Sequence, residues 1–383
     1  MRSYLDHAST SPVRPQAIDA MMSYLSGPVG DPGRIHSEGM TARAALEDAR
    51  DRVADLVGAR SREIVFTSGA TEAITAACFG AITKTADLRH VVLSRVEHSA
   101  VREASERCWV PGVETTYVGV SDTGVIDAAE LIAAIRPDTA LVHIQWVNHE
   151  VGSVQPVARV VEHCRESGVL VHVDAAQAVG RLAVDFKSLG ADLMSVSGHK
   201  FGGPPGTGAL VVRRGLRLPP LILGGDQERA RRAGMENVAS LVGLGAAATV
   251  TAESWRSEAE ISIRLRDRIR DWAAAADGIV AYGREPDLSP HIICLGIEDM
   301  EPQPVLLGLD QRGVAVHSGS SCSSEALEPS PVLEAMGVDA QRSLRISLGW
   351  TSTDDDVDRL LDGLEAVLSD LHALRSSMTS ESS

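Results

Sequence analysis

Residues 169–203 read VLVHVDAAQAVGRLAVDFKSLGADLMSVSGHKFGG and contain two apolar runs, at 169–173 and 193–196, that are typical of buried strands. Asp174 follows the first run directly, and Lys200 follows the second run in a glycine-rich segment. In open α/β sheets, ligands bind beyond the carboxyl ends of the strands. We therefore expect the Asp174 carboxylate and the Lys200 amine to serve one ligand site.

Strand-like and helical segments alternate on both sides of this stretch. Such alternation predicts an α/β fold, in which a mostly parallel sheet is covered by helices on both faces. Residues 41–57 place apolar side chains on one helical face, and Gly58 ends that pattern. Further strands are predicted at 64–66, 91–94, 140–146 and 209–212, with helices near 71–82, 99–107, 127–135 and 156–166.

The character of the sequence changes after residue 253. A long, charged, amphipathic helix is predicted at about 255–275, and shorter strands and helices follow it, as in a small α+β domain. These are strands near 290–295, 314–316 and 344–348, and helices near 302–311, 330–336 and 353–371. We expect residues 1–14 to pack on the small domain, 15–253 to form the large domain, 254–370 to form the small domain, and the polar residues 371–383 to be a disordered tail.

The composition predicts a globular protein with a sizeable core, because 44% of the 383 residues are hydrophobic and 23% are charged. The formal net charge of −16 argues against a nucleic-acid-binding surface and against attraction to anionic lipid, which both need clustered Lys and Arg. No run approaches the 18 or so apolar residues of a membrane span, and residues 1–6 lack a signal-peptide core. We expect a cytoplasmic protein with no membrane partner and no direct nucleic-acid partner.

Lysine is rare in this chain, which has 36 basic residues but only three lysines, Lys84, Lys187 and Lys200. Because arginine cannot replace a Schiff-base lysine, Lys200 in such a background indicates a required amine. Pyridoxal phosphate (PLP) needs such a lysine, an acid on its pyridine nitrogen, a phosphate site and a group packed on its ring. Asp174 is the candidate acid. Taken singly, Asp174 could instead cap a helix, and Lys200 could be a solvated loop residue.

The two remaining PLP requirements also have candidates. Residues 67–72 join a strand to a helix, and the backbone there, at Ala70, together with the Thr71 hydroxyl can hold a phosphate at the positive end of the helix. His98 follows the next strand and can stack on the ring or move protons. An ordinary helix cap and a structural histidine are the alternatives for these two features.

Cys322 and Arg345 are the candidates for substrate chemistry. Cys322 lies in residues 317–325, which have almost no large side chains, so we predict an exposed, mobile loop with a nucleophilic thiolate. The chain's other cysteines are scattered without metal-ligand spacing, and Cys78 and Cys294 lie in apolar runs. Arg345 is suited to hold a substrate α-carboxylate, with a surface salt bridge as its alternative.

Taken together, these motifs resemble the cysteine desulfurases, which belong to the class V aminotransferase group of fold-type I PLP enzymes. The similarity is colinear over about residues 4–370, and the long serine-rich loop resembles that of the branch serving iron–sulfur assembly. The fold implied is a large domain with a seven-stranded, mostly parallel sheet and a smaller α+β domain. The matching segments are 4–10, 68–72, 97–98, 171–177, 197–200, 318–322, 327–330 and 344–349.

The resemblance implies a role for each matching residue. L-cysteine would be converted to L-alanine, Cys322 would carry the sulfur as a persulfide to a protein acceptor, and the chain would form a homodimer. His98 would stack on the PLP ring and donate a proton, and Arg345 would bind the substrate carboxylate. In the cofactor site, Lys200 would form the Schiff base, Asp174 would pair with the pyridine nitrogen, Gln177 would bond the ring hydroxyl, and Thr71, Ser197 and His199 would hold the phosphate.

Five positions depart from the family pattern. The cofactor-contacting asparagine is replaced by His149, and the asparagine near the substrate carboxylate is replaced by Asp31. The threonine that would reach the partner subunit's phosphate is Met235, whose loss of one charge-assisted bond would cost about 1.5–3 kcal/mol. Two expected glycines are Asp226 and Ala230. These departures indicate a divergent member.

Two alternatives remain open from the sequence. The first is another PLP enzyme of the same fold, such as a C–S lyase, a selenocysteine lyase or an aminotransferase. The second is a weakly active or non-catalytic binding protein in which the departures record a loss of cofactor affinity. The sequence does not name the sulfur acceptor.

Overall fold

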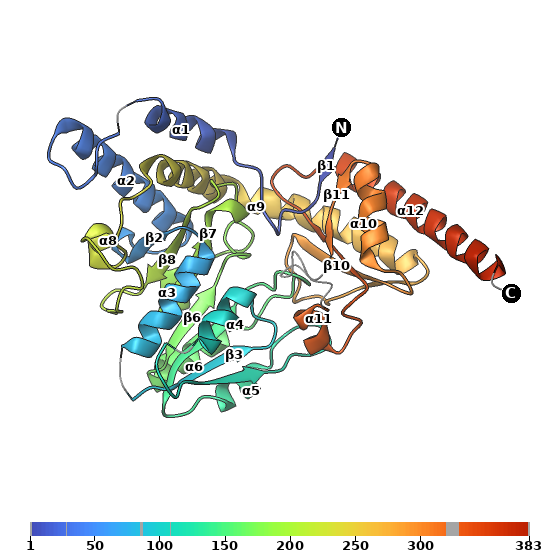
Figure 1. Ribbon diagram of the computed structural model, residues 1–383, viewed down its shortest axis with the longest axis horizontal. Helices are drawn as coiled ribbons and strands as arrows, with labels where there is room; N and C mark the ends of the chain where they lie inside the picture. Colours follow the sequence, from blue (N-terminus) through green and yellow to red (C-terminus); the bar gives the residue numbers. More distant parts are fainter. Residues whose placement is uncertain (1, 28, 85–86, 108, 319–328, 382–383) are drawn as a thin grey trace.

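The computed structural model describes residues 2–27, 29–84, 87–107, 109–318 and 329–381. Its centre is a seven-stranded sheet in which β8 alone is antiparallel to its neighbours and the other pairs are parallel. This confirms the predicted fold class (Figure 1). In spatial order the strands are β2 (Ile64–Thr67), β8 (Gly208–Val212), β7 (Leu193–Ser197), β6 (Leu170–Asp174), β5 (Thr139–Gln145), β3 (His90–Ser94) and β4 (Glu114–Val118).

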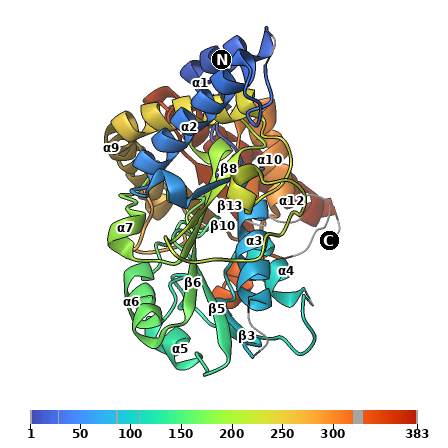
Figure 2. The same cartoon turned by 90° about the vertical axis from the view of Figure 1, so that its left-hand side faces the viewer.

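Helices cover both faces of this sheet because its strands are apolar on both sides. On β5, Leu141 packs into one apolar cluster, while Val142 and Ile144 pack into the cluster on the opposite face. One face is covered by α3 (Ala70–Thr83) and α4 (Ser99–Glu106); the other by α5 (Ala128–Ala133), α6 (Val157–Ser167) and α7 (Phe186–Leu189) (Figure 2).

The longest helix, α9 (Val238–Ala275), connects the two domains. Its first half packs against α1 (Pro15–Leu25) and α2 (Ser37–Leu56) on the large domain, and its second half packs on the small domain. The expected helix at 255–275 is only the C-terminal half of α9. No loop therefore separates the domains at the predicted boundary after residue 253.

The small domain is built on a four-stranded antiparallel sheet. The N-terminal segment joins it, because β1 (Ser3–Tyr4) pairs with β11 (Val314–Ala315) and Leu5 lies in its apolar cluster. The sheet strands are β12 (His317–Ser318), β13 (Ser343–Ser347), β10 (Ile292–Ile297) and β9 (Ile279–Ala281), and the helices are α10 (Pro302–Gln311), α11 (Pro331–Met336) and α12 (Asp354–Glu381).

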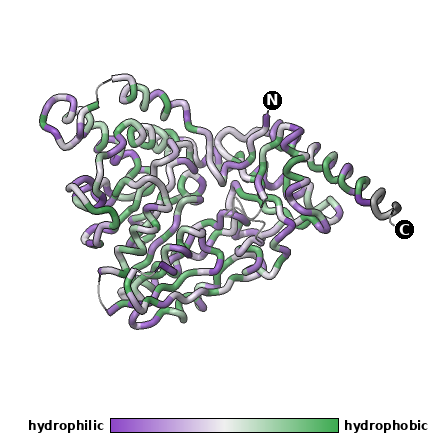
Figure 3. The backbone as a smooth tube through the Cα atoms, in the orientation of Figure 1, coloured by the Kyte–Doolittle hydropathy of each residue, from purple (hydrophilic) through white to green (hydrophobic). Residues whose placement is uncertain are grey.

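The prediction of a disordered tail from residue 371 is wrong up to Glu381, because α12 continues to that residue. Leu360, Leu364 and Val367 form a buried stripe on α12, and Leu371 extends it. A helix that is nucleated by such packing adds further turns at little cost. Hydropathy alternates along α12, and its end projects from the body of the protein (Figures 1 and 3). In the part of the chain that the structure describes, every helix is too short or too polar to cross a bilayer.

Candidate active site

The predicted site residues lie around one pocket of about 470 Å³ at the carboxyl ends of β5, β6 and β7. This volume is within the usual range for small-molecule sites, roughly 300–1,000 Å³. Ala8 and Ser9 of the N-terminal segment also line it. The residues predicted from sequence that line it are Ala70, Thr71, His98, His149, Asp174, Gln177, Ser197, His199, Lys200 and Arg345.

Two predicted residues are not among them. Cys322 lies outside the described residues. Asp31 lines a separate groove beside α2, where its Oδ1 accepts a hydrogen bond from Gly33 N at 2.8 Å and its Oδ2 is 3.2 Å from Arg34 Nε. The Asp31 carboxylate is thus bonded to residues of the tight turn that follows it. The structure therefore does not bring Asp31 to the substrate pocket within one chain.

Asp174 ends β6 and is buried against the pocket. Its Oδ1 accepts hydrogen bonds from Ser195 Oγ at 2.8 Å and from Ala176 N at 3.0 Å. Burial raises the pKa of Asp174 above its ordinary value, so a cation on the pocket side would stabilise the ionised form. Because both of these hydrogen bonds engage Oδ1, Oδ2 keeps its capacity to accept a hydrogen bond from a protonated pyridine nitrogen. Asp174 fits the predicted partner of a PLP ring.

Lys200 closes a short helical turn, η2 (Gly198–Lys200), directly after β7. Its Nζ donates hydrogen bonds to the main-chain oxygens of Ala8 and Ser9, the second at 2.8 Å. Ser11 Oγ donates to the Lys200 carbonyl at 3.1 Å. The N-terminal segment therefore positions the lysine amine over the same pocket as the Asp174 carboxylate.

The N-terminus of α3 forms the predicted phosphate cup. Gly69 is the N-cap residue of α3 and provides no side-chain cap, so the first backbone N–H groups of the helix can bind an anion. A Cβ at Gly208 on β8 would lie 2.7 Å from Gly69 Cα, so only glycine lets the cup approach the sheet. The residues present therefore fit a phosphate group at this end of the pocket.

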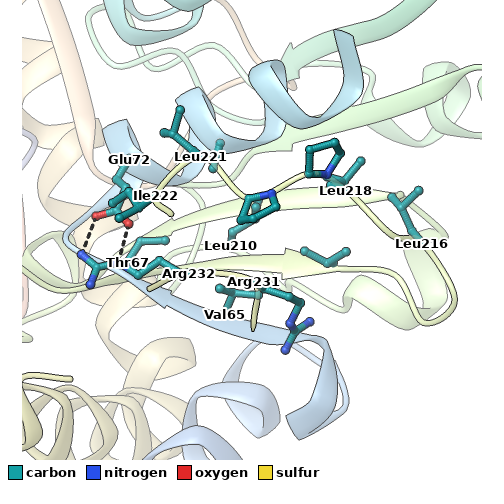
Figure 4. A pocket seen from close by; sticks show the side chains of 14 residues that line it. Val65, Thr67, Glu72, Leu210, Leu216, Leu218, Leu221, Ile222, Arg231 and Arg232 are labelled. Atoms are coloured by element: carbon teal, nitrogen blue, oxygen red, sulfur yellow. Dashed lines mark hydrogen bonds and ion pairs between the residues drawn. The ribbon is translucent and has the colours of Figure 1, made fainter. Parts of the chain in front are cut away.

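An ion pair anchors the segment that forms this cup. Arg232 Nε donates to Glu72 Oε1 at 2.9 Å, and Glu72 Oε2 accepts from Ser68 N at 2.8 Å. This pair lies at one end of a small pocket of about 40 Å³ (Figure 4). The loop that carries Leu218 and Leu221 also lines this pocket. The Arg232–Glu72 pair thus holds the cup in place, a role that the sequence analysis missed.

His98 and His149 place two imidazole rings beside each other on the pocket wall, with ring centroids 5.0 Å apart and planes at 66°. His98 Nδ1 accepts a hydrogen bond from Ala100 N at 3.0 Å, so the ring caps α4. Burial, aided by His149 and Lys200, lowers the pKa of His98 to about 3. The neutral ring is suited to stacking on a cofactor, and the proton donation expected of His98 stays a prediction.

Arg345 on β13 is buried at the edge of the pocket. Its Nη2 donates to Asp6 Oδ1 at 3.0 Å and to Ser9 Oγ at 2.7 Å, and its Nη1 donates to the His149 carbonyl at 2.9 Å. The surface salt bridge weighed as its alternative is excluded, because the Arg345 side chain is only 2% exposed. A buried, oriented guanidinium fits the binding of a substrate carboxylate.

Two predicted cofactor contacts, Gln177 and His199, have side-chain partners of their own. Gln177 Nε2 donates to the Ala8 carbonyl at 2.9 Å, and its Oε1 is 3.3 Å from His291 Nε2. His199 Nδ1 lies 3.2 Å from Thr10 Oγ1, and burial lowers the pKa of His199 to about 4. Ser197 is buried at the end of β7. Each of these residues is held in place by the N-terminal segment or by the sheet.

Sequence reasoning also missed Glu97, Ser195 and Asp6. Glu97 is completely buried behind the pocket, where its Oε1 accepts from Ser94 Oγ at 2.9 Å and from Gln145 N at 3.0 Å. Burial, together with the nearby Asp174 carboxylate, raises the pKa of Glu97 to about 7. Ser195 could have been found, because it points to the same face of β7 as Ser197. Glu97 and Asp6 lie in the matching segments 97–98 and 4–10, but the motifs alone assign no role to either carboxylate.

Comparison with known proteins identifies the family. The family model described as aminotransferase class-V matches residues 3–360. "Cysteine desulfurase IscS 1" of Archaeoglobus fulgidus is 38% identical over 375 residues, which cover 97% of this chain and 98% of the relative. "Cysteine desulfurase IscS" of Klebsiella pneumoniae is 40% identical over 368 residues, or 94% of this chain and 91% of the relative. This chain belongs to the cysteine desulfurases of the aminotransferase class-V family.

Solved structures agree with the cysteine desulfurase assignment. A structure titled "NIFS-LIKE PROTEIN" matches with a TM-score of 0.90 and 32% identity, and the match covers 96% of this chain and all of that one. A structure titled "SspA in complex with cysteine" matches with a TM-score of 0.80 and 32% identity, over 90% of this desulfurase and 98% of that chain. The family and fold expected from the sequence motifs are confirmed.

Proposed function

We propose that this protein is a PLP-dependent cysteine desulfurase that converts L-cysteine to L-alanine and transfers the sulfur through a persulfide on Cys322. The observation that carries the proposal is the placement of the Lys200 amine and the Asp174 carboxylate on one pocket, next to the uncapped N-terminus of α3. These groups meet the needs of PLP, and the relatives that cover nearly the whole chain are named cysteine desulfurases.

The residues of the pocket would divide the work. When bound, PLP would supply an electron sink for cleavage of bonds at the substrate carbons. Lys200 would attach the cofactor and move a proton at Cα, and Asp174 Oδ2 would hold the proton on the pyridine nitrogen. The cup at Ala70 and Thr71, with Ser197 and His199, would bind the phosphate. Gln177 would face the ring hydroxyl, and the neutral His98 ring would pack on the cofactor plane.

The Arg345 guanidinium would bind the carboxylate of L-cysteine. Asp6 and the His149 carbonyl fix its two terminal nitrogens, so its orientation does not depend on the substrate. Cys322 would act as the thiolate that takes the substrate sulfur and passes it to a protein acceptor. We place the protein in the cytoplasm and expect no direct nucleic-acid partner.

We also propose that two copies of the chain form a homodimer. Exposed apolar side chains lie on α1, around the start of α2 and in the loops on either side of α8 (Gln227–Ala230), elements at one end of the protein (Figure 1). A second copy covering them would remove this apolar surface from water. The exposed side chains are Ile18, Met22, Leu25, Ile35, Met40, Leu223 and Met235.

Product analysis of the purified protein with L-cysteine tests the proposal. Alanine should form in step with sulfide released by a reductant, and the Lys200→Ala variant should form neither. The Cys322→Ala variant should form no protein-bound persulfide. Pyruvate as the product would instead identify a C–S lyase, and a keto acid formed without sulfur release would identify an aminotransferase. Preference for selenocysteine over cysteine would identify a selenocysteine lyase.

A further inference from the structure

A buried histidine of the small domain contacts a residue of the pocket. His291 directly precedes β10 and is only 1% exposed. Its Nε2 lies 3.3 Å from Oε1 of Gln177, which lines the pocket from the large domain. The sequence motifs assign no role to His291, so this contact between the two domains appears only in the folded chain.

The main chain around His291 is held from both domains. Leu348 N, which follows β13, donates to the His291 carbonyl at 2.8 Å. Ser289, two residues before His291, donates its N–H to the Gly152 carbonyl of the large domain at 2.8 Å. The Ser289 carbonyl accepts from Arg266 Nη1 of α9 at 3.0 Å. The imidazole therefore projects from a backbone that has little freedom to shift.

The orientation of the Gln177 amide follows from its other partner. The Ala8 carbonyl oxygen can only accept hydrogen bonds, and it lies 2.9 Å from Gln177 Nε2. If the amide were turned over, Oε1 would face this carbonyl and the two acceptors would repel each other. The NH₂ group of Gln177 therefore faces Ala8, and its Oε1 faces His291.

The same contacts fix the position of the proton on the His291 ring. Because Gln177 Oε1 only accepts, His291 Nε2 must carry a hydrogen in order to bond to it. Burial, followed in effect by the Arg181 guanidinium, lowers the pKa of His291 well below its ordinary value. The ring is therefore neutral, and its single proton is on Nε2. Its Nδ1 then keeps a lone pair, and no residue that the structure describes donates to it.

One hydrogen of the Gln177 amide is left for a ligand. The NH₂ group has two hydrogens, and the Ala8 carbonyl accepts one of them. Within the described part of the chain, no second acceptor contacts Gln177 Nε2. Gln177 lines the same pocket as Asp174 and Lys200, the two groups that would hold the PLP ring. Because both polar atoms of the amide are held, its second N–H has a fixed direction.

We propose that His291 is a positioning residue, which holds the Gln177 amide so that its second N–H points at the ring hydroxyl oxygen of PLP. The inference rests on the proposed function. A donor at this oxygen stabilises the negative charge there and competes with the Schiff-base N–H of Lys200 for the same oxygen. The Schiff base therefore loses its proton at a lower pH than it would without the donor. Because His291 belongs to the small domain, the contact links this proton affinity to the packing of the two domains.

A pH titration of the visible absorption band of the PLP-loaded protein measures this effect. His291→Phe keeps a buried ring but removes the N–H. It should raise the midpoint of the titration by about one unit, because a hydrogen bond to a charged oxygen is weakened. His291→Gln places an N–H group the same number of bonds from Cα and should restore the wild-type midpoint. His90→Phe is the matched control and should leave the midpoint unchanged, since His90 is buried at the amino end of β3, away from the pocket.

A double-mutant cycle tests whether His291 acts through Gln177. Gln177→Leu alone should raise the midpoint at least as much as His291→Phe does. The addition of His291→Phe to Gln177→Leu should cause no further shift. An unchanged midpoint in His291→Phe, or shifts of the two variants that simply add, would overturn the proposal.

The tautomer of the His291 ring gives a second measurement, which is made on the cofactor-free protein. In NMR spectra of protein with isotope-labelled histidine, the His291 proton should be on Nε2, and the His291→Gln variant assigns the signal. A proton on Nδ1 instead refutes the orientation of the Gln177 amide and with it the proposal. If the loaded wild-type protein forms no alanine from cysteine, the proposed function fails, whereas the midpoint shifts and the tautomer still decide the role of His291.

Discussion

The buried ion pair between Arg50 and Glu228 gives the sharpest stability prediction. Each side chain is 2% exposed, and the two carboxylate oxygens accept from Arg50 Nη1 and Nη2 at 2.6 and 2.7 Å. Glu228 Oε2 also accepts from Phe66 N at 2.9 Å, so this carboxylate ties α8 to α2 and β2. A Glu228→Gln side chain would place an amide group against the guanidinium and leave the buried cation with only the exposed Glu47 carboxylate as a counter-charge.

We expect Glu228→Gln to lower the free energy of unfolding by about 3–5 kcal/mol, the usual cost of removing one partner from a buried pair. Urea denaturation of the cofactor-free protein, at one protein concentration and followed by circular dichroism, measures it. Glu47→Gln is the matched control. Glu47 also pairs with Arg50, at 3.2 Å, but its side chain is 46% exposed, so its loss should cost about 1 kcal/mol or less.

Equal losses for Glu228→Gln and Glu47→Gln would refute this reasoning, because burial would then not set the cost. The double variant Arg50→Met/Glu228→Met gives a second check. Since it removes both charges together, it should be more stable than Glu228→Gln alone.

Three further predictions follow from single positions. Ala230 has a φ of 59°, in the left-handed region, so Ala230→Gly should raise the free energy of unfolding by about 1 kcal/mol; a decrease in a urea titration would contradict this. Burial lowers the pKa of His143 from its ordinary 6.5 to about 3 in the folded protein. At a pH between these two values His143 gains a proton when the protein unfolds, so lowering the pH favours unfolding. His143→Gln should therefore reduce the loss of stability between pH 6.5 and 5 by about 2 kcal/mol in denaturation curves at several pH values, and an unchanged slope would exclude His143 as a cause. Met235 is 60% exposed, and Met235→Thr should tighten PLP binding about tenfold in the dimer by restoring a phosphate contact, measured by dialysis against PLP; equal affinity would contradict the contact inferred from the family.

The local hydrophobic pattern of the sequence predicted the strands of the large domain well and those of the small domain less completely. The predicted strands at 64–66, 193–196 and 209–212 each differ from the observed strand by one residue at one end, because apolar runs between turns mark buried strands. The edge strand β4 was not predicted, since its half-exposed residues form no apolar run. The short strands β9 and β12 were also missed, because pairing with neighbours distant in sequence decides them.

Two errors share one physical cause. The helix expected at 255–275 is part of a helix that begins at Val238, and the expected tail is part of α12. In both cases apolar packing on another part of the helix stabilises its first turns, and the helix then extends through polar residues. Local composition alone does not report such support.

The sequence by itself determined the α/β fold, the family, and the two residues at the strand ends, Asp174 and Lys200. The fold class follows from periodicity, the family from the resemblance of motifs, and the two residues from side-chain chemistry that has no substitute. Only the tertiary structure decided which charges meet. Arg345 contacts Asp6 across 339 residues, and His149 lies against His98 while Glu150 reaches Ser330. Such contacts depend on how the N-terminal segment, the central sheet and the small domain pack together, and no local pattern encodes that packing.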